Sequence, residues 1–385
     1  MAATSPLHTP LCDLLGIEYP IILAGMGGAA GPTLAAAVSN AGGLGVVGAT
    51  GYTPDELREM IRKLRSLTDK PFGIDLLLPS NIQEEGSREE FSATIPEANR
   101  AFVRQLQERF GVPNPTPAAR ERPPLTSTYY RDQVRVVLEE HVPVFASGLG
   151  SPGFMVPDAH AQGMKVIGLA GNLRHARRVA DAGCDAVVAQ GTEAGGHTGQ
   201  ISTLVLVPQI VDGVAPTPVV AAGGIATGRQ IVATLALGAV GVWCGTAFLL
   251  SEEAYQDAVE MEMQTAWYVR TLKEKYKLAT PQDAKVGRWY SGKPMRHLKN
   301  PWSDAWEEPG GPGALPMPLQ GLLVADAQRS VSQNHIEDLV FGPVGQAIGL
   351  IDEIRPARDI VADLVADAEA ALAAVGARQQ AMGSR

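Results

Sequence analysis

The sequence has few cysteines and no excess of positive charge. Its three cysteines, Cys12, Cys184 and Cys244, form no CxxC pair and are odd in number. This arrangement predicts neither a zinc site nor a disulfide framework, and it favours a reducing compartment, the cytoplasm. With 32 Lys and Arg residues against 41 Asp and Glu residues, the net charge of −9 gives no attraction for the phosphates of nucleic acid. We therefore expect no metal and no nucleic-acid partner.

Long hydrophobic runs are missing as well. No run of 18 apolar residues occurs, and the first ten residues, MAATSPLHTP, lack the basic-then-apolar order of a signal peptide. We therefore expect neither membrane insertion nor export. The GxSxG turn of a serine hydrolase is also absent, which argues against Ser-His-Asp catalysis.

From Tyr19 to about Leu250, short apolar runs alternate with longer helical patterns. Such alternation is typical of a parallel sheet, and continuous apolar runs indicate strands buried on both faces. Eight units in about 230 residues favour an α/β fold of the (β/α)₈ TIM-barrel type, with a doubly wound sheet as the alternative. The expected strands are Tyr19 to Ala24, Gly43 to Val47, Phe72 to Leu77, Val144 to Ser147, Lys165 to Leu169, Ala186 to Ala189, Pro218 to Ala222 and Val240 to Cys244.

Two long segments depart from this alternation. Residues 79–130, after the third strand, are charged and proline-rich, and we expect an insertion beside the barrel mouth with a helix at Glu97 to Phe110. Residues 255–385 predict a mostly helical, tryptophan-rich extension that follows a barrel of residues 14–254. Its tryptophans indicate either a hydrophobic cluster on the barrel wall or a lid. Its last helix, Pro356 to Ala377, is expected outside the barrel or at a subunit contact, which leaves a homodimer open.

Glycine-rich segments follow four of the expected strands. TIM barrels place their working residues at these carboxyl ends, and glycine lets main-chain N–H groups approach a flat ring or a phosphate. The pattern therefore predicts a phosphorylated planar cofactor. The residues concerned are Gly25, Met26 and Gly27 after the first strand, Gln190, Gly195 and Gly196 after the sixth, Gly223 and Gly224 after the seventh, and Gly245 and Thr246 after the eighth.

His197 lies in the glycine-rich segment after the sixth strand, and the other six histidines are scattered without metal-ligand spacing. A lone histidine is often a structural residue. Imidazole, however, titrates near neutral pH and suits removal of a weakly acidic C–H proton beside a cofactor. We therefore predict His197 as a catalytic base.

These segments resemble the nitronate monooxygenase family, FMN-dependent TIM-barrel enzymes also known as 2-nitropropane dioxygenases. The resemblance covers about Leu14 to Glu253 and is most specific in QGTEAGGHTG, residues 190–199, and PVVAAGGIATG, residues 218–228. It implies FMN as the cofactor and places His197 on the family's catalytic base. It also implies that Gly25, Met26, Gly27, Gln190, Gly195 and Gly196 contact the flavin and that Gly223, Gly224, Gly245 and Thr246 contact its phosphate.

Two residues depart from the family pattern. Asp75 stands where the family commonly has a flavin-binding asparagine, and Trp243 stands where it commonly has glutamine. Ionised aspartate only accepts hydrogen bonds, and tryptophan replaces an amide by bulk, so the flavin potential and the substrate shape are expected to differ. We still count Asp75 among the flavin-binding residues.

The resemblance implies an oxidoreductase in which His197 removes or orients the substrate's α-proton, FMN takes the electrons and O₂ reoxidises FMN. The first interpretation is a monooxygenase acting on alkyl nitronates or nitroalkanes. The second is an FMN-dependent NAD(P)H reductase of an enoyl thioester or a quinone. The third is a flavin-binding protein without turnover, because a fold alone does not fix a function.

Overall fold

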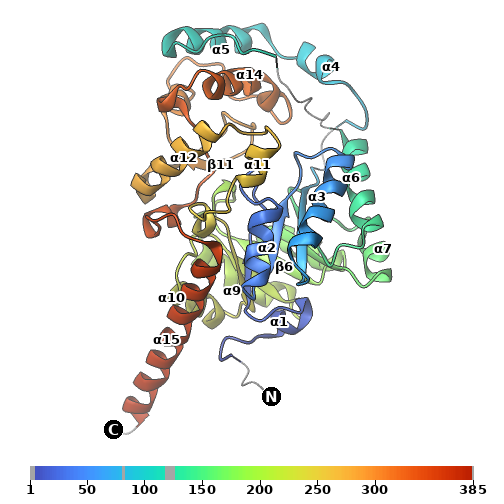
Figure 1. Cartoon of the computed structure of the whole chain (residues 1–385), viewed down its shortest axis with the longest axis vertical. Coiled ribbons are helices and arrows are strands. Elements are labelled where there is room, and N and C mark those ends of the chain that lie inside the picture. The colour runs from blue at the N-terminus through green and yellow to red at the C-terminus, as the bar shows by residue number, and fades with distance from the viewer. Residues whose placement is uncertain (1–4, 80–82, 118–125, 384–385) are drawn as a thin grey trace.

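Eight parallel strands form a barrel at the centre of the protein (Figure 1). The computed structural model describes residues 5–79, 83–117 and 126–383. The strand order is β1-β9-β8-β6-β5-β4-β3-β2, and backbone hydrogen bonds from β1 to Leu44, just before β2, join the two edges. The TIM barrel is thus confirmed, and the doubly wound alternative is wrong. The strands are β1 (Ile21–Leu23), β2 (Gly45–Gly48), β3 (Phe72–Leu77), β4 (Val144–Gly148), β5 (Lys165–Ala170), β6 (Ala186–Gln190), β8 (Val219–Ala222) and β9 (Gly241–Cys244).

The barrel strands are buried on both faces, as their apolar sequences predict. Ile22 belongs to a cluster inside the barrel, whereas its neighbour Leu23 packs outward against the helices. Helix α1 (Pro10–Leu15) adds Leu11 to the inner cluster and lies below the barrel in Figure 1. One end of the barrel is therefore filled by α1, and the carboxyl ends of the strands face the other end.

Helices surround the barrel and start at well-formed caps. Thr53 and Glu56 form a capping box at the start of α3, and Thr227 and Gln230 form one at the start of α10. Helices α3 and α10 therefore begin directly after these capping threonines. The surrounding helices are α2 (Pro32–Asn40), α3 (Pro54–Leu67), α6 (Ser127–Glu139), α7 (Val156–Ala161), α8 (Leu173–Asp181), α9 (Thr203–Val214) and α10 (Gly228–Ala236).

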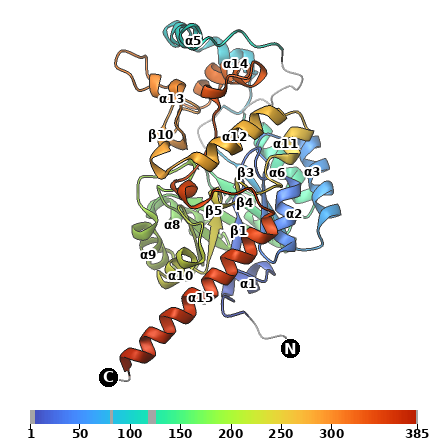
Figure 2. The same ribbon diagram turned by 60° about the vertical axis from the view of Figure 1, so that its left-hand side comes forward.

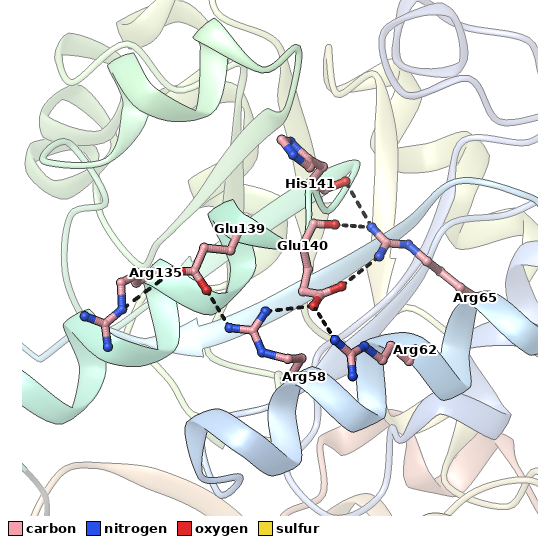
Figure 3. A network of polar contacts seen from close by, with 7 residues as sticks. All are labelled: Arg58, Arg62, Arg65, Arg135, Glu139, Glu140 and His141. Carbon is pink, nitrogen blue, oxygen red and sulfur yellow. Dashed lines mark hydrogen bonds and ion pairs between the residues drawn. The ribbon is translucent and has the colours of Figure 1, made fainter.

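Ion pairs connect α3 with the end of α6 on the outside of the barrel (Figure 3). Arg58 and Arg65 lie 2.8 and 3.0 Å from the carboxylate of Glu140, and Arg62 lies 3.6 Å from it. Burial acts to raise the pKa of Glu140, but the hydrogen bond from Arg58 and the three positive charges hold it below its ordinary value. The network holds the end of α6 against α3. It thereby fixes the place where the chain returns from the insertion to the barrel.

The insertion packs against the extension. Phe102 of the insertion meets the ring of Trp306 edge-on, with centroids 5.0 Å apart, and Asn99 donates a hydrogen bond of 3.1 Å to the carbonyl of Gly313. Figures 1 and 2 show these segments together above the barrel, opposite α1. We call this unit the cap. It contains α4 (Arg88–Ala93), α5 (Glu97–Phe110), α13 (Pro301–Ala305) and α14 (Leu319–Gln333), and α11 (Gln256–Glu260) and α12 (Ala266–Leu278) connect it to the barrel.

A short antiparallel sheet lies between the cap and the barrel mouth. Strands β10 (Ala284–Gly287) and β11 (Met295–Leu298) form a hairpin, and β11 pairs with β7 (Gly196–His197). The sequence predicts only a loop at residues 195–197, because a two-residue strand leaves no periodic signal. The hairpin therefore brings the extension into direct contact with the predicted catalytic residue.

The last helix, α15 (Ala357–Gly383), runs down the outside of the barrel and projects beyond it (Figure 2). Its first half packs on α10, where Gly228 lies directly against the backbone of Ala368. The prediction of a C-terminal helix is confirmed. Within the described residues, no helix is long and apolar enough to cross a membrane.

Candidate functional site

A cavity of about 860 Å³ opens at the carboxyl ends of the barrel strands. TIM barrels carry their active sites at this end. All of the site residues predicted from the sequence lie in its wall, although they lie in or after five different barrel strands. They are Gly25, Met26, Gly27, Asp75, Gln190, Gly195, Gly196, His197, Gly223, Gly224, Gly245 and Thr246.

The turn after β8 consists of two glycines in a left-handed conformation. Gly223 has a φ of +108° and Gly224 a φ of +74°, which other residues rarely adopt. A Cβ atom added to Gly223 would lie 2.8 Å from Oγ1 of Thr203, and one added to Gly224 would lie 3.1 Å from Cβ of Glu193. The main chain itself therefore forms this part of the wall, as a phosphate-binding turn requires.

Thr246 follows β9 and receives support from the extension. Its hydroxyl oxygen accepts a hydrogen bond of 2.9 Å from the backbone N–H of Gly345. Because a hydroxyl group also has one proton to donate, the Thr246 O–H remains available to a ligand. The predicted phosphate end thus depends on the loop around Gly345, which the sequence did not indicate.

Asp75 lies in β3, and its carboxyl group is buried next to Gly25, close to the end of β1. Its Oδ1 atom forms no hydrogen bond with any described residue, and burial raises the pKa of its side chain to about 8. A Cβ atom on Gly25 would lie 2.4 Å from Oδ2 of Asp75, so only glycine fits opposite it. At neutral pH the carboxyl keeps its proton and can donate a hydrogen bond as an asparagine amide does. An unpaired polar group in this wall fits the polar edge of a flavin.

His197 lies in β7, and its side chain is held by the hairpin. Its Nε2 atom lies 2.8 Å from Oγ of Ser291, and its backbone carbonyl accepts a 2.8 Å hydrogen bond from Gln190. Burial, and to a smaller extent the charge of Lys293, lowers the pKa of the imidazole to about 4. The ring is therefore neutral near pH 7. In the tautomer that carries its proton on Nε2 and donates it to Ser291, Nδ1, which has no hydrogen-bond partner among the described residues, keeps its lone pair.

Arg296 connects the segment of His197 to the hairpin. Its buried guanidinium group donates hydrogen bonds of 3.0 and 2.8 Å to the carbonyl of Thr192 and one of 2.7 Å to the carbonyl of Ala284. Neither carbonyl belongs to the barrel sheet: Thr192 lies in the loop after β6, and Ala284 is the first residue of β10. Arg296 therefore determines how the segment after β6 sits over the cavity.

Trp243 forms the floor of the cavity. It belongs to the cluster inside the barrel and is almost completely buried, yet it also lines the cavity. A side chain of this size fills the barrel from within, so it limits the depth of the cavity.

Sequence reasoning missed several parts of the wall, and two of them are instructive. One is the hairpin turn with Tyr290 and Lys293, for which the sequence carried no signal because its approach to the barrel depends on long-range pairing. The other is the loop Gly148-Leu149-Gly150 after β4. Here a signal was present, since two glycines follow a strand as they do at the predicted strand ends. Leu149 has a φ of +61°, which is uncommon for a residue with a side chain.

The chain matches known proteins along nearly its whole length. The family model of nitronate monooxygenase matches residues 8–367. A Mycobacterium tuberculosis protein is 41% identical over 375 residues, which cover 93% of this chain and 96% of the relative. A probable nitronate monooxygenase of Staphylococcus saprophyticus is 35% identical over 314 residues (76% and 79%). A 5-hydroxy-7a-methyl-1-oxo-octahydro-1H-indene-4-carboxyl-CoA dehydrogenase of Rhodococcus jostii is 30% identical over 410 residues (97% and 99%).

Solved structures show the same architecture. A nitroalkane oxidase of Streptomyces ansochromogenes superposes with a TM-score of 0.75 at 29% identity, covering 95% of this chain and 99% of that one. FabK of Thermotoga maritima superposes with a TM-score of 0.72 at 34% identity, covering 96% and 99%. The fold, the cavity and the sequence agreement identify an oxidoreductase, and the chain belongs to the nitronate monooxygenase family.

Proposed function

We propose that this protein uses FMN to oxidise alkyl nitronates and nitroalkanes with O₂, and that His197 is its catalytic base. The observation that carries the proposal is the neutral imidazole of His197, which Ser291 fixes in the wall of the 860 Å³ cavity. A neutral, positioned imidazole can accept the weakly acidic α-proton of a nitroalkane.

The residues present fit FMN. The left-handed Gly223 and Gly224 and the hydroxyl proton of Thr246 suit the phosphate. The carboxyl group of Asp75, whose Oδ1 has no partner among the described residues, suits the polar edge of the ring. When bound, FMN would supply an acceptor for the electrons of the nitronate and would pass them to O₂. We assign the ring to Gly25, Met26, Gly27, Asp75, Gln190, Gly195 and Gly196, and the phosphate to Gly223, Gly224, Gly245 and Thr246.

Two residues of this chain act on the α-proton of the substrate: His197 accepts it, and Ser291 positions the imidazole ring. The C–H bond of the nitroalkane breaks, its electron pair stays on the nitronate and its proton moves to Nδ1 of His197. In the tautomer that carries its proton on Nε2, Ser291 accepts the hydrogen bond of this proton, and Nδ1 is then available to accept the substrate proton. Met295 and Tyr290, which line the cavity from the hairpin, help to exclude water from this step.

The alternative is an NAD(P)H-dependent reductase of an enoyl thioester or a quinone. It is favoured by the match to FabK and by the CoA-linked substrate in the name of the Rhodococcus jostii relative. An anaerobic absorption spectrum separates the two functions. Bleaching of the flavin by NADPH without any oxidation of nitronate would support the reductase.

The variant His197→Asn tests the proposed base. We expect it to keep FMN, identified after denaturation, because no predicted FMN contact is removed. Its turnover of neutral nitroalkane should fall by about 10²–10⁴-fold, which is the usual contribution of a general base. Its turnover of pre-formed nitronate should fall much less, since that substrate has already lost the proton. Oxygen consumption with both substrate forms measures the difference.

His141→Asn is the matched control for this experiment. His141 is exposed, lies outside the cavity and has a φ of +47°, a conformation that asparagine tolerates. Its rates should equal those of the wild type. Equal losses with both substrate forms in His197→Asn would instead assign His197 a positioning role.

A further inference from the structure

The hairpin turn places one lysine in the wall of the cavity, close to His197. Lys293 lies two residues before β11, is half-buried and lines the 860 Å³ cavity. The first residue of β11, Met295, pairs with His197 of β7. Lys293 and His197 are therefore brought together by a strand pair, although they lie far apart in the chain.

The turn that carries Lys293 is fixed on two sides. The backbone N–H of Lys293 donates a hydrogen bond of 3.3 Å to Oγ of Ser291, the same oxygen that lies 2.8 Å from Nε2 of His197. Gly292 has a φ of +83°, and a Cβ atom on it would lie 2.1 Å from the carbonyl oxygen of Leu315, which precedes α14. The cap therefore supports the turn from behind, and Ser291 connects the backbone of Lys293 to the imidazole of His197.

The cavity wall offers no ionised carboxylate to this lysine. Asp75 contributes the only carboxyl group among the residues that line the cavity, and burial raises its pKa to about 8. Among the described residues, the ammonium group of Lys293 has neither an ion-pair partner nor a hydrogen-bond partner. A half-buried charge without a partner is unfavourable, so the site is suited to an anion.

A second cation in the wall, Arg178, acts on a different part of the cavity. Burial, followed by the charge of Lys293, lowers the pKa of His197. Burial also lowers the pKa of His175, followed by the charges of Arg174 and Arg178. Lys293 is therefore the cation beside the proposed base, whereas Arg178 lies beside His175.

We propose that Lys293 binds the nitro group of the substrate and stabilises the negative charge that this group gains when His197 takes the α-proton. The inference rests on the proposed function, because it adds a second role to the proton transfer assigned to His197. In that step the C–H bond breaks, its proton moves to Nδ1 of His197, and its electron pair spreads onto the two oxygens of the nitro group. A cation that is already fixed beside these oxygens stabilises the charge as it develops.

The same arrangement accounts for a base that has a positive neighbour. Without substrate, Lys293 opposes protonation of His197, because two positive charges would then lie close together. The nitronate that forms in the transfer carries one negative charge, which attracts both the imidazolium and the ammonium group. Lys293 therefore keeps His197 neutral in the free enzyme and favours the transfer once a nitroalkane is bound.

Titration with nitrate tests this anion site without turnover. Nitrate is planar and carries one negative charge on oxygens bound to nitrogen, as a nitronate does. Its binding to the FMN-loaded full chain is measured by calorimetry and by the change in flavin absorption. We expect Lys293→Gln to weaken saturable nitrate binding about 10- to 100-fold, the usual effect of a lost hydrogen bond to a charged group, and Lys293→Arg to restore it.

Oxygen consumption with pre-formed nitronate gives a second readout, which a purely structural role of Lys293 would not produce. In Lys293→Gln the KM for nitronate should rise about 10- to 100-fold, whereas kcat should change little, because the lost contact binds a charge that is already present. This pattern differs from that of His197→Asn, which should affect nitronate much less than neutral nitroalkane.

Lys70→Gln is the matched control, because Lys70 is an exposed lysine before β3 that does not line the cavity. It should bind nitrate as the wild type does. Absence of saturable nitrate binding, or equal affinity in the Lys293→Gln and Lys70→Gln variants, would overturn the proposal. A loss confined to Arg178→Gln would place the anion on α8 instead.

Two further outcomes separate this proposal from the proposed function. Loss of FMN from Lys293→Gln, measured on the same preparations, would assign the lysine to the phosphate of the cofactor and overturn the proposal. Nitrate binding that depends on Lys293, in a wild type that oxidises neither nitroalkane nor nitronate, would support the anion site and reject the proposed function alone.

Discussion

At the scale of single residues, the cavity holds two titratable groups that burial shifts in opposite directions. It raises the pKa of Asp75 to about 8 and lowers that of His197 to about 4. Near pH 7 both groups are uncharged, so one can donate a hydrogen bond and the other can accept a proton. The sequence predicted both positions from the ends of their strands. It could not predict their protonation, because the atoms that bury them come from β1 and from the hairpin.

The variant Asp75→Asn should be more stable than the wild type at pH 8 in the flavin-free protein, but not at pH 4. The unfolded aspartate loses its proton near pH 3.9, whereas the folded one keeps it to about pH 8. The wild type is therefore fully stabilised below about pH 4 and loses stability as the pH rises through this window, by at most about 1.4 kcal/mol per pH unit. Asparagine cannot ionise and lacks this decline. Urea unfolding at a series of pH values measures it.

The exposed aspartate Asp69 provides a control for charge removal, as Asp69→Asn. The difference between this variant and the wild type should not grow between pH 4 and pH 8. Parallel stability curves for wild type and Asp75→Asn across the same range would show that Asp75 is ionised in the folded protein, and its role as a hydrogen-bond donor would then be wrong.

At the scale of elements, sequence patterns predicted the strands and helices whose bounds depend on residues close in the chain. All eight barrel strands occur, and most of their ends differ from the expected ones by one or two residues. The helix at Glu97–Phe110 has the predicted bounds, since Gly111 ends it in a left-handed conformation. The strands of the hairpin, with the sequences AKVG and MRHL, have no such signal. The pairing of β11 with β7 joins Met295 to His197, which lie far apart in the chain.

Arg296→Met tests the hairpin as the support of the site. Methionine keeps much of the length of the side chain but leaves the carbonyls of Thr192 and Ala284 without their buried donors. We expect a loss of about 1–3 kcal/mol in the free energy of unfolding, the usual cost of unsatisfied buried polar groups. FMN should also dissociate more easily, since the segment after β6 is no longer fixed. Urea unfolding and flavin release during dialysis measure the two effects.

Arg135→Met is the control for the loss of an arginine. The side chain of Arg135 is mostly exposed and forms surface ion pairs on α6 (Figure 3), which contribute about 0–1 kcal/mol. Its stability and flavin retention should stay close to those of the wild type. If Arg296→Met behaves in the same way, the hairpin is not what holds the segment of His197.

At the scale of the whole molecule, the cap joins two segments that lie far apart in the sequence. Trp289 and Trp302 are buried in the main hydrophobic core, as the expectation of a hydrophobic cluster requires, whereas the hairpin turn beside Trp289 reaches the cavity. A lid that covers the substrate stays a prediction. Composition indicated an insertion and an extension. It could not indicate that they pack together, since contacts such as that of Phe102 with Trp306 need the folded barrel to bring them near. The division into residues 14–254 and 255–385 remains a prediction.

The projecting end of α15 provides the last prediction. Up to residue 372 the helix contacts the rest of the molecule: Asp367 accepts a hydrogen bond of 3.1 Å from the backbone of Arg229, Ser5 donates one of 2.9 Å to Glu369, and Leu372 packs against the hydrophobic core. Beyond it, Val375 is 57% exposed. A chain that ends after residue 373 should therefore keep the melting temperature and the FMN content of the full chain. A chain that ends after residue 356 should be strongly destabilised, because it loses Leu364 and other buried side chains, each contributing about 1.5–3 kcal/mol.

Light scattering on the same two truncated chains and on the full chain addresses the homodimer. Isolated helical ends are marginal in water, so an exposed half-helix gains most of its stability from packing. If the full chain is a dimer and the chain ending after residue 373 is a monomer with an unchanged melting temperature, the projecting end of the helix is the dimer contact. A dimer that survives this truncation would place the contact elsewhere on the barrel. A large fall in the melting temperature of the same variant would show that the projecting end stabilises the barrel itself, contrary to the exposure of Val375.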